Sequence, residues 1–179
     1  MNYRSGFNSI PPVVKNLIII NVLMLLATFV FERMGISLYT YLGLYFPLSE
    51  SFRLHQIFTH MFMHGGLTHL FFNMFALYMF GRVLESVWGP KRFLIFYLVT
   101  GIGAAVLHSL VNFIEYEHVT SQISPEQVAY VKEAGYNLWT EGKKFSDPLL
   151  GKLNMVLNTP TVGASGAVFG ILLGFGMLF

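Results

Sequence analysis

The apolar positions of this chain gather into long runs that polar segments separate. Four such runs are present, at residues 13–31, 67–84, 93–113 and about 162–179. A helix needs roughly 20 apolar residues to cross a hydrocarbon core about 30 Å thick. The pattern therefore predicts four membrane-spanning helices. Because no polar residue stops the last run before Phe179, we expect a truncated chain that ends soon after the start of its fourth helix.

The first run has to be distinguished from a cleaved signal peptide. Pro11-Pro12 precedes it and Glu32-Arg33 follows it, without a small-residue cleavage site. A signal peptide carries such a site directly after its apolar core. We therefore expect an uncleaved first helix.

An aromatic and partly polar segment, residues 34–66, joins the first two runs. Its aromatic side chains include Tyr39, Tyr41, Tyr45, Phe46, Phe52 and Phe58. Pro47, Glu50 and Arg53 make it too polar for a simple span. Tyrosine favours headgroup depth, and amphipathic segments lie along the membrane surface. We predict an interfacial loop.

A polar insertion, residues 114–160, separates the third and fourth runs. The sequence from Ser124 to Gln127 has a cap residue, a proline at the first helical position and a glutamine that completes a capping box, so it predicts a helix start. We expect Gly135 to end that helix and Asp147-Pro148 to start another. The insertion holds six acidic and four basic residues, which predicts an excursion into solvent.

Basic residues indicate the orientation of the spans. Lys91-Arg92 occupies a short turn between the second and third runs, and Arg4 and Lys15 lie at the start of the chain. Short cytoplasmic loops are enriched in Lys and Arg. We therefore expect an integral, multi-pass protein of a bacterial-type plasma (inner) membrane with a cytoplasmic N-terminus.

With either orientation, the second and fourth spans begin on the same side of the membrane. Three polar residues then lie at similar depth: His69, Asn73 and Ser165. Polar side chains in a bilayer are costly unless they face a cavity or one another. Because these three residues lie at a common depth, we expect them to face one another or a shared cavity and to form one functional site.

The composition narrows the classes of function. Of the 179 residues, 54% are hydrophobic and 11% are charged, whereas soluble domains are about 25% charged. The net charge is only +2 and no Lys/Arg-rich run is present, so we expect no nucleic-acid partner. The chain has no cysteine, which excludes disulfides, thiolate metal sites and a cysteine nucleophile.

The fourth run opens with small residues around one hydroxyl. Ser165 lies between Gly163 and Gly166, at the predicted start of a helix. The first N–H groups of a helix lack intrahelical partners and carry the positive end of its dipole, so they suit a developing oxyanion. Gly166, Gly170 and Gly174 repeat every four residues, a spacing that lets a neighbouring helix pack closely. The alternative is that Ser165 only caps the helix and the glycines only pack.

His69 and Asn73 are four residues apart and project from one helix face. Both can donate hydrogen bonds, and beside the Ser165 N–H they would form an oxyanion hole. The alternative is that they hold helices together, as polar residues do in membrane bundles.

A metal site is a further possibility for the histidines, since His60 and His64 have i, i+4 spacing. An H-E-x-x-H metalloprotease motif needs a glutamate between them, and the intervening Met61-Phe62-Met63 has none. Haem ligation by a pair of histidines is the other alternative. We expect no metal and no cofactor.

The segment from His60 to Asn73, followed by Gly163-Ala164-Ser165-Gly166, resembles the rhomboid family of intramembrane serine proteases. The interfacial loop and Glu85 at the end of the second span also match. The resemblance covers nearly the whole chain. It implies an all-α membrane protein, a polytopic helical bundle seen here as its first four helices.

The resemblance also implies roles for individual residues. Ser165 matches the nucleophile, while His69 and Asn73 match the side chains that stabilise the oxyanion. Gly163 and Gly166 match the flanking glycines, and His64 matches a supporting histidine. The expected reaction is hydrolysis of peptide bonds in or near transmembrane helices of membrane-protein substrates, through an acyl-enzyme within the lipid bilayer.

One part of the family pattern is missing. The general base of rhomboids is a histidine on the sixth membrane helix, and this chain has no such helix. His108 is the one histidine in a later span than His69, and polar packing is the better interpretation of it. A non-catalytic rhomboid-like protein that binds transmembrane clients is therefore the alternative function. A small-solute transporter is less favoured, because no pair of broken helices with inverted symmetry is present.

Overall fold

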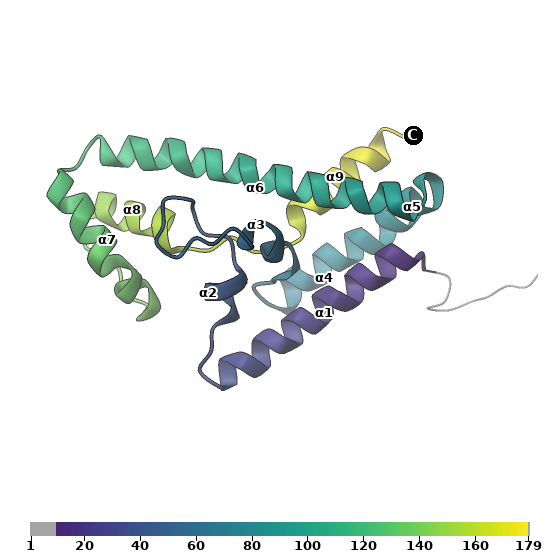
Figure 1. The fold of residues 1–179 in the computed structure, drawn as a ribbon, viewed down its shortest axis with the longest axis horizontal. Coiled ribbons are helices and arrows are strands. Elements are labelled where there is room, and N and C mark those ends of the chain that lie inside the picture. Colours follow the sequence, from purple (N-terminus) through teal and green to yellow (C-terminus); the bar gives the residue numbers. More distant parts are fainter. Residues whose placement is uncertain (1–9, 179) are drawn as a thin grey trace, which may run out of the picture.

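A computed structural model describes residues 10–178, and these residues form helices joined by loops (Figure 1). Three helical stretches are long and apolar enough to cross a membrane: α1 (Pro12–Arg33), the stretch Leu67–Trp88, and α6 (Pro90–Thr120). A shorter apolar helix, α9 (Ser165–Gly176), follows later in the chain. Within the described residues the only pairing of the β type is an isolated bridge between Leu44 and Thr161. The prediction of an all-α, polytopic helical bundle is confirmed.

The second of these stretches is not a uniform α-helix. It consists of α4 (Leu67–Ala76), a π-helical turn (Leu77–Gly81) and α5 (Arg82–Trp88). Smaller helices lie outside the spans, and they are α2 (Leu38–Leu42), α3 (Gln56–Thr59), the 3-10 turn His60–Phe62, α7 (Pro125–Thr140) and α8 (Pro148–Asn158).

The start of α1 is capped by a residue from another helix. Pro11, at the N-cap position, supplies no side-chain hydrogen bond. Instead the buried carboxylate of Glu85 in α5 accepts from the backbone N–H groups of Val13 (2.9 Å) and Val14 (2.8 Å). These N–H groups have no intrahelical partners, and the positive helix end favours an anion. Glu85 thereby fixes the start of α1 and the end of α5 at the same end of the bundle, on the right of Figure 1.

Glycines let α9 lie directly against α6. A Cβ on Gly166 would overlap that of Ala104, and a Cβ on Gly170 would lie 2.5 Å from the Thr100 Cβ. The predicted use of the four-residue glycine spacing for close helix packing is confirmed. The close contact removes any room for larger side chains along this seam.

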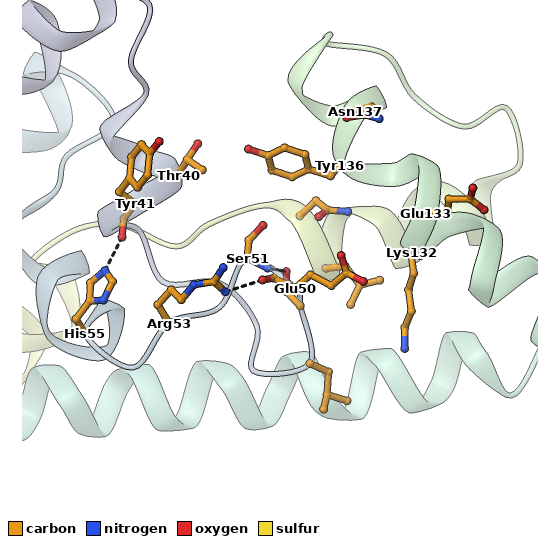
Figure 2. A pocket seen from close by; sticks show the side chains of 14 residues that line it. Thr40, Tyr41, Glu50, Ser51, Arg53, His55, Lys132, Glu133, Tyr136 and Asn137 are labelled. Carbon is orange, nitrogen blue, oxygen red and sulfur yellow. Dashed lines mark hydrogen bonds between the residues drawn. The ribbon is translucent and has the colours of Figure 1, made fainter.

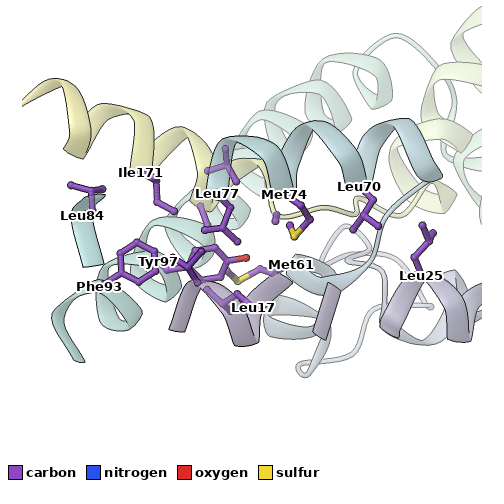
Figure 3. Close-up of a cluster of buried hydrophobic side chains, with 14 residues drawn as sticks. Leu17, Leu25, Met61, Leu70, Met74, Leu77, Leu84, Phe93, Tyr97 and Ile171 are labelled. Carbon is purple, nitrogen blue, oxygen red and sulfur yellow. The ribbon is translucent and has the colours of Figure 1, made fainter. Parts of the chain in front are cut away.

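A single apolar core joins the spans. Figure 3 shows its buried side chains in a row between the helices, from Leu84 and Phe93 at one end to Leu70 and Leu25 at the other. Met61, from the 3-10 turn, reaches into the middle of this row. The turn that precedes α4 is therefore held by the same core as the spanning helices.

The insertion begins later than the sequence pattern predicts, because α6 continues to Thr120 rather than ending near residue 113. The start of α7 has the predicted capping box: Gln127 N donates to Ser124 Oγ, and Ser124 N donates to Gln127 Oε1. Asp147 caps α8 through the N–H groups of Leu149 and Leu150. Both predicted helix starts are confirmed.

The prediction that Gly135 ends the first helix of the insertion is wrong. The helix runs on to Thr140, and Gly135 is buried in the contact between α7 and α8, where a Cβ would overlap Asn154. Gly135 is therefore a packing residue rather than a stop.

The insertion also has an apolar core of its own, separate from that of the spanning helices. The buried members of this second core are Phe46, Val119, Val131, Leu150, Leu153, Val156 and Leu157. Phe46 comes from the interfacial segment and Val119 from the end of α6. The insertion is thus anchored to the C-terminal end of α6, at the far left of Figure 1.

Candidate active site

The backbone that leads to Ser165 is held on two sides. Thr161 exchanges two backbone hydrogen bonds with Leu44 of the interfacial segment, at 2.8 and 2.9 Å. Two residues later, Gly163 N donates to the backbone carbonyl of His60 (2.9 Å). Gly163 has φ +125°, which side chains rarely tolerate. These contacts delay the start of α9 to Ser165, although the apolar run starts at Val162.

Ser165 is the first helical residue, and it does not cap the helix. The N-cap position belongs to Ala164, without any side-chain cap. The Ser165 hydroxyl forms no hydrogen bond among residues 10–178. The interpretation of Ser165 as a simple cap is therefore wrong for this structure. Its side chain is half-buried and lines a pocket of about 210 Å³ between α6 and α9.

The imidazole of His69 lies against Gly163. A Cβ on Gly163 would be 2.7 Å from His69 Cε1 and 2.8 Å from Nε2, so the ring occupies the space that any side chain would need. Gly65 N donates to His69 Nδ1 (3.4 Å), which assigns the proton of the neutral ring to Nε2. The structure thus brings a potential donor, His69 Nε2–H, next to the start of α9.

Asn73 lies one turn further along α4 and is buried. Its side-chain Nδ2 donates to the backbone carbonyl of His69 (2.9 Å). This bond lies within α4 and stabilises the turn that carries His69, so it does not join α4 to another helix, as the helix-holding interpretation of Asn73 would require. The second amide hydrogen and the amide oxygen are not used by it.

His64 packs edge-on against His69, with ring centroids 5.1 Å apart and planes at 64°. It is fully buried, and neither ring nitrogen has a hydrogen-bond partner among the described residues. Burial, and next the nearby His69, lower the pKa of His64 to about 4. Tyr39 Oη donates to the backbone carbonyl of His64 (2.8 Å). His64 is therefore a neutral side chain that supports one side of the His69 ring.

Two other histidines line the pocket beside Ser165. His60 donates its Nδ1–H to the Gln56 carbonyl (2.9 Å), and burial lowers its pKa. Nε2 of His108 lies 2.6 Å from the Thr161 hydroxyl and accepts from Asn112 Nδ2 at 3.2 Å. Neither histidine is hydrogen-bonded to Ser165, so the structure identifies no base for it within the described residues.

Sequence reasoning missed His60 as a neighbour of Ser165. It assigned His60 to the interfacial segment, and the bond that joins His60 O to Gly163 N spans about a hundred residues. No local signal in the sequence reports such a contact. Among residues 10–178, no cluster of three or more metal-ligating side chains is present.

Comparison with known proteins identifies the family of the chain. Residues 51–179, more than half of the chain, match the Rhomboid domain family. The Rhomboid protease AarA of Providencia stuartii is 30% identical over 111 residues, which is 62% of this chain and 29% of that protein. The chloroplastic Rhomboid-like protein 11 of Arabidopsis thaliana is 38% identical over 96 residues, which is 53% of this chain and 32% of that protein.

One similar protein is described as inactive. Inactive RHOMBOID-like protein 8 of Arabidopsis thaliana is 36% identical over 55 residues, or 31% of this chain and 16% of that protein. The chain thus spans a third or less of the length of each of these relatives. Its match over residues 51–179 nevertheless establishes the family: this chain is a member of the rhomboid family.

Proposed function

We propose that this chain carries the nucleophile and the oxyanion-binding groups of an intramembrane serine endopeptidase. Its substrates would be membrane proteins cleaved in or near a transmembrane helix. One observation supports this above all: the His69 ring packs on Gly163, two residues before Ser165, although the two lie far apart in the sequence. The His69 Nε2–H donor, the Ser165 hydroxyl and the first N–H groups of α9 therefore lie close together.

In this proposal Ser165 Oγ attacks the carbonyl carbon of the scissile bond and its proton passes to a base. The carbonyl oxygen becomes an oxyanion, which accepts hydrogen bonds from the Ser165 N–H and His69 Nε2–H. The tetrahedral intermediate collapses, the base returns the proton to the leaving amine, and an acyl-enzyme remains. Water then attacks the acyl-enzyme by the same route and releases Ser165.

Asn73 has two possible contributions in this mechanism. Its bond to the His69 carbonyl orients the histidine, and its second amide hydrogen remains available for the oxyanion. We assign both His69 and Asn73 to oxyanion stabilisation, with His64, Gly163 and Gly166 in support.

The base is proposed to come from a later helix of the whole protein, as the family resemblance implies. A serine hydroxyl is a poor nucleophile without an adjacent base. His69 is used as a donor, and His108 is already engaged by Thr161 and Asn112. Residues 1–179 expressed alone should therefore show no proteolysis.

The membrane side of the site is part of the proposal. The exposed turn at Lys91-Arg92 lies at the same end of the bundle as the start of α1, which favours a cytoplasmic N-terminus in a bacterial-type plasma (inner) membrane. Ser165 would then lie toward the opposite side. Tagging each loop for accessibility to an impermeant reagent tests this orientation.

A non-catalytic, client-binding rhomboid-like protein is the second candidate, since one relative is described as inactive. The two are distinguished by covalent chemistry. The whole protein should react with a fluorophosphonate at Ser165 and cleave a fluorogenic transmembrane substrate. Client binding without either reaction would favour the second candidate.

A further inference from the structure

The interfacial segment, residues 34–66, borders two cavities that the proposed chemistry does not use. The first is an apolar groove of about 360 Å³ between this segment and α6. Val106, Leu110 and Phe113 of α6 face Phe46, Leu48 and Phe52 across it. Since these walls are apolar side chains, they provide no hydrogen bonds that would stabilise water or a charged ligand in the groove.

The depth of the groove follows from the length of α6. At 1.5 Å per residue, a ~30 Å hydrocarbon core accommodates about 20 residues. Counted from the basic turn at Lys91-Arg92, these are residues 93–113. Val106 and Leu110, which are 53% and 55% exposed, lie in the half of the bilayer on the Ser165 side. Within the described residues, the groove is therefore open at hydrocarbon depth.

The second cavity is a polar cleft of about 590 Å³ between the interfacial segment and α7 (Figure 2). Arg53 and Glu50 line it on one side, and Lys132 and Glu133 on the other. Within the described residues none of these four forms an ion pair. Arg53 Nη1 donates to the backbone carbonyls of Glu50 and Phe52, both at 2.7 Å, which holds the guanidinium at the cleft.

The two cavities are neighbours, because Leu48 lines both. One is apolar and at hydrocarbon depth. The other is polar, and α7, which lines it, follows the end of α6 beyond that depth. We propose that together they bind one zwitterionic phospholipid of the leaflet on the Ser165 side, with an acyl chain in the groove and the head group in the cleft.

The charges of the cleft favour a head group that carries both signs. Arg53 and Lys132 suit a phosphate, whereas Glu50 and Glu133 suit an ammonium group. A purely anionic head group would meet the two carboxylates without compensation.

The test is photolabelling of the whole protein in vesicles of phosphatidylcholine that carries a diazirine on its acyl chain. Mass spectrometry then locates the label along the chain. Val106→Trp fills the groove, while Val111→Trp adds the same bulk at a valine of α6 that is equally exposed (54%) and does not line the groove. We expect label on both walls of the groove, lowered roughly tenfold by Val106→Trp and unchanged by Val111→Trp.

Equal labelling of all exposed α6 positions, or equal effects of the two variants, would overturn the proposal, because the lipid would then be ordinary bulk lipid. Cross-linking of the groove to a second copy of the chain would overturn it as well. Thermal unfolding in detergent checks that each variant is folded. If Val106→Trp is not, Ser109→Leu fills the same groove and carries the same expectation.

The head-group assignment is tested by replacing the host and probe lipids with phosphatidylglycerol, which carries only the negative charge. Groove labelling should fall severalfold, and Arg53→Gln with Lys132→Gln should lower the phosphatidylcholine signal, while Lys144→Gln should not. Equal labelling by both lipids would refute the zwitterionic preference. The site does not depend on Ser165, so a Ser165→Ala chain should give the same result.

Discussion

The spanning bundle and the insertion are both helical, yet they are held together differently. In the bundle, helices approach through glycines, and the polar groups gather at one level near Ser165. In the insertion, α7 and α8 have side-chain caps at their starts and pack through aliphatic residues, with one glycine, Gly135, in their contact. The first region therefore depends on close contact for its chemistry, whereas the second depends on local signals for its folding. Substitutions matched between the two regions should separate these dependencies.

The largest difference is expected from the serines. In the whole protein, Ser165→Ala should reduce cleavage of a transmembrane substrate by roughly a million-fold, as loss of a serine nucleophile does in other proteases. Unfolding should hardly change, because Ser165 makes no cap hydrogen bond. Ser124→Ala in the insertion is the matched control, with activity retained. Cleavage near the wild-type rate by Ser165→Ala would exclude Ser165 from the mechanism.

The next effect concerns the two donors. His69→Ala and Asn73→Ala should each lower kcat by roughly 10- to 1,000-fold with little change in KM, because oxyanion contacts form only in the transition state. His118→Ala, at an exposed position near the end of α6, and Asn137→Ala, at an exposed position of α7, should leave kinetics unchanged. A change confined to KM or to stability would instead favour a purely structural role for His69 and Asn73.

Glycine substitutions compare the packing of the two regions directly. Gly166→Ala and Gly135→Ala each place a Cβ onto an atom of a neighbouring helix, and overpacking costs about 1–3 kcal/mol. Gly166→Ala should also lower activity, because it displaces the helix that starts at Ser165, whereas Gly135→Ala should not. Adding Ala104→Gly should rescue Gly166→Ala. Rescue failure would show that the Ala104 contact does not limit the approach of α9 to α6.

A pH effect is expected from His64. Its pKa is about 4 in the folded chain and near 6.5 when unfolded, so the unfolded state binds more protons between these values. Stability should therefore fall as pH decreases below 6.5, by about 2 kcal/mol at pH 5. The measurement is unfolding in detergent at pH 7 and pH 5, with His64→Phe expected to weaken the dependence. An unchanged dependence in that variant would assign it to other groups.

The smallest effect is expected from a cap in the insertion. Asp147→Ala removes an acceptor for the N–H groups of Leu149 and Leu150, at a cost of about 1 kcal/mol. Hydrogen exchange should increase in α8 and remain unchanged in α4 and α9. Faster exchange throughout the chain would mean that the insertion and the bundle unfold as one unit.

The structural features that could be predicted from the sequence are those that depend on residues close together in the chain. The apolar runs became helices, and Ser124 and Asp147 became caps, because these signals act within a few positions. The sequence did not predict that Gly135 packs against Asn154 or that the His60 carbonyl binds the Gly163 N–H. Each of these contacts joins residues that are far apart in the sequence, and a single sequence does not indicate which distant residues meet in the fold. The catalytic roles of Ser165, His69 and Asn73 stay predictions until the kinetics are measured.

The cap of α1 has a consequence for synthesis. Glu85 lies 72 residues after Val13, whose N–H it accepts, so the ribosome makes the helix long before its cap. At 5–20 residues per second the delay is roughly 4 to 14 s. During that interval lipid head groups or water must satisfy the first N–H groups of α1. The first helix should therefore remain free to shift along the membrane normal until α5 emerges and fixes its position.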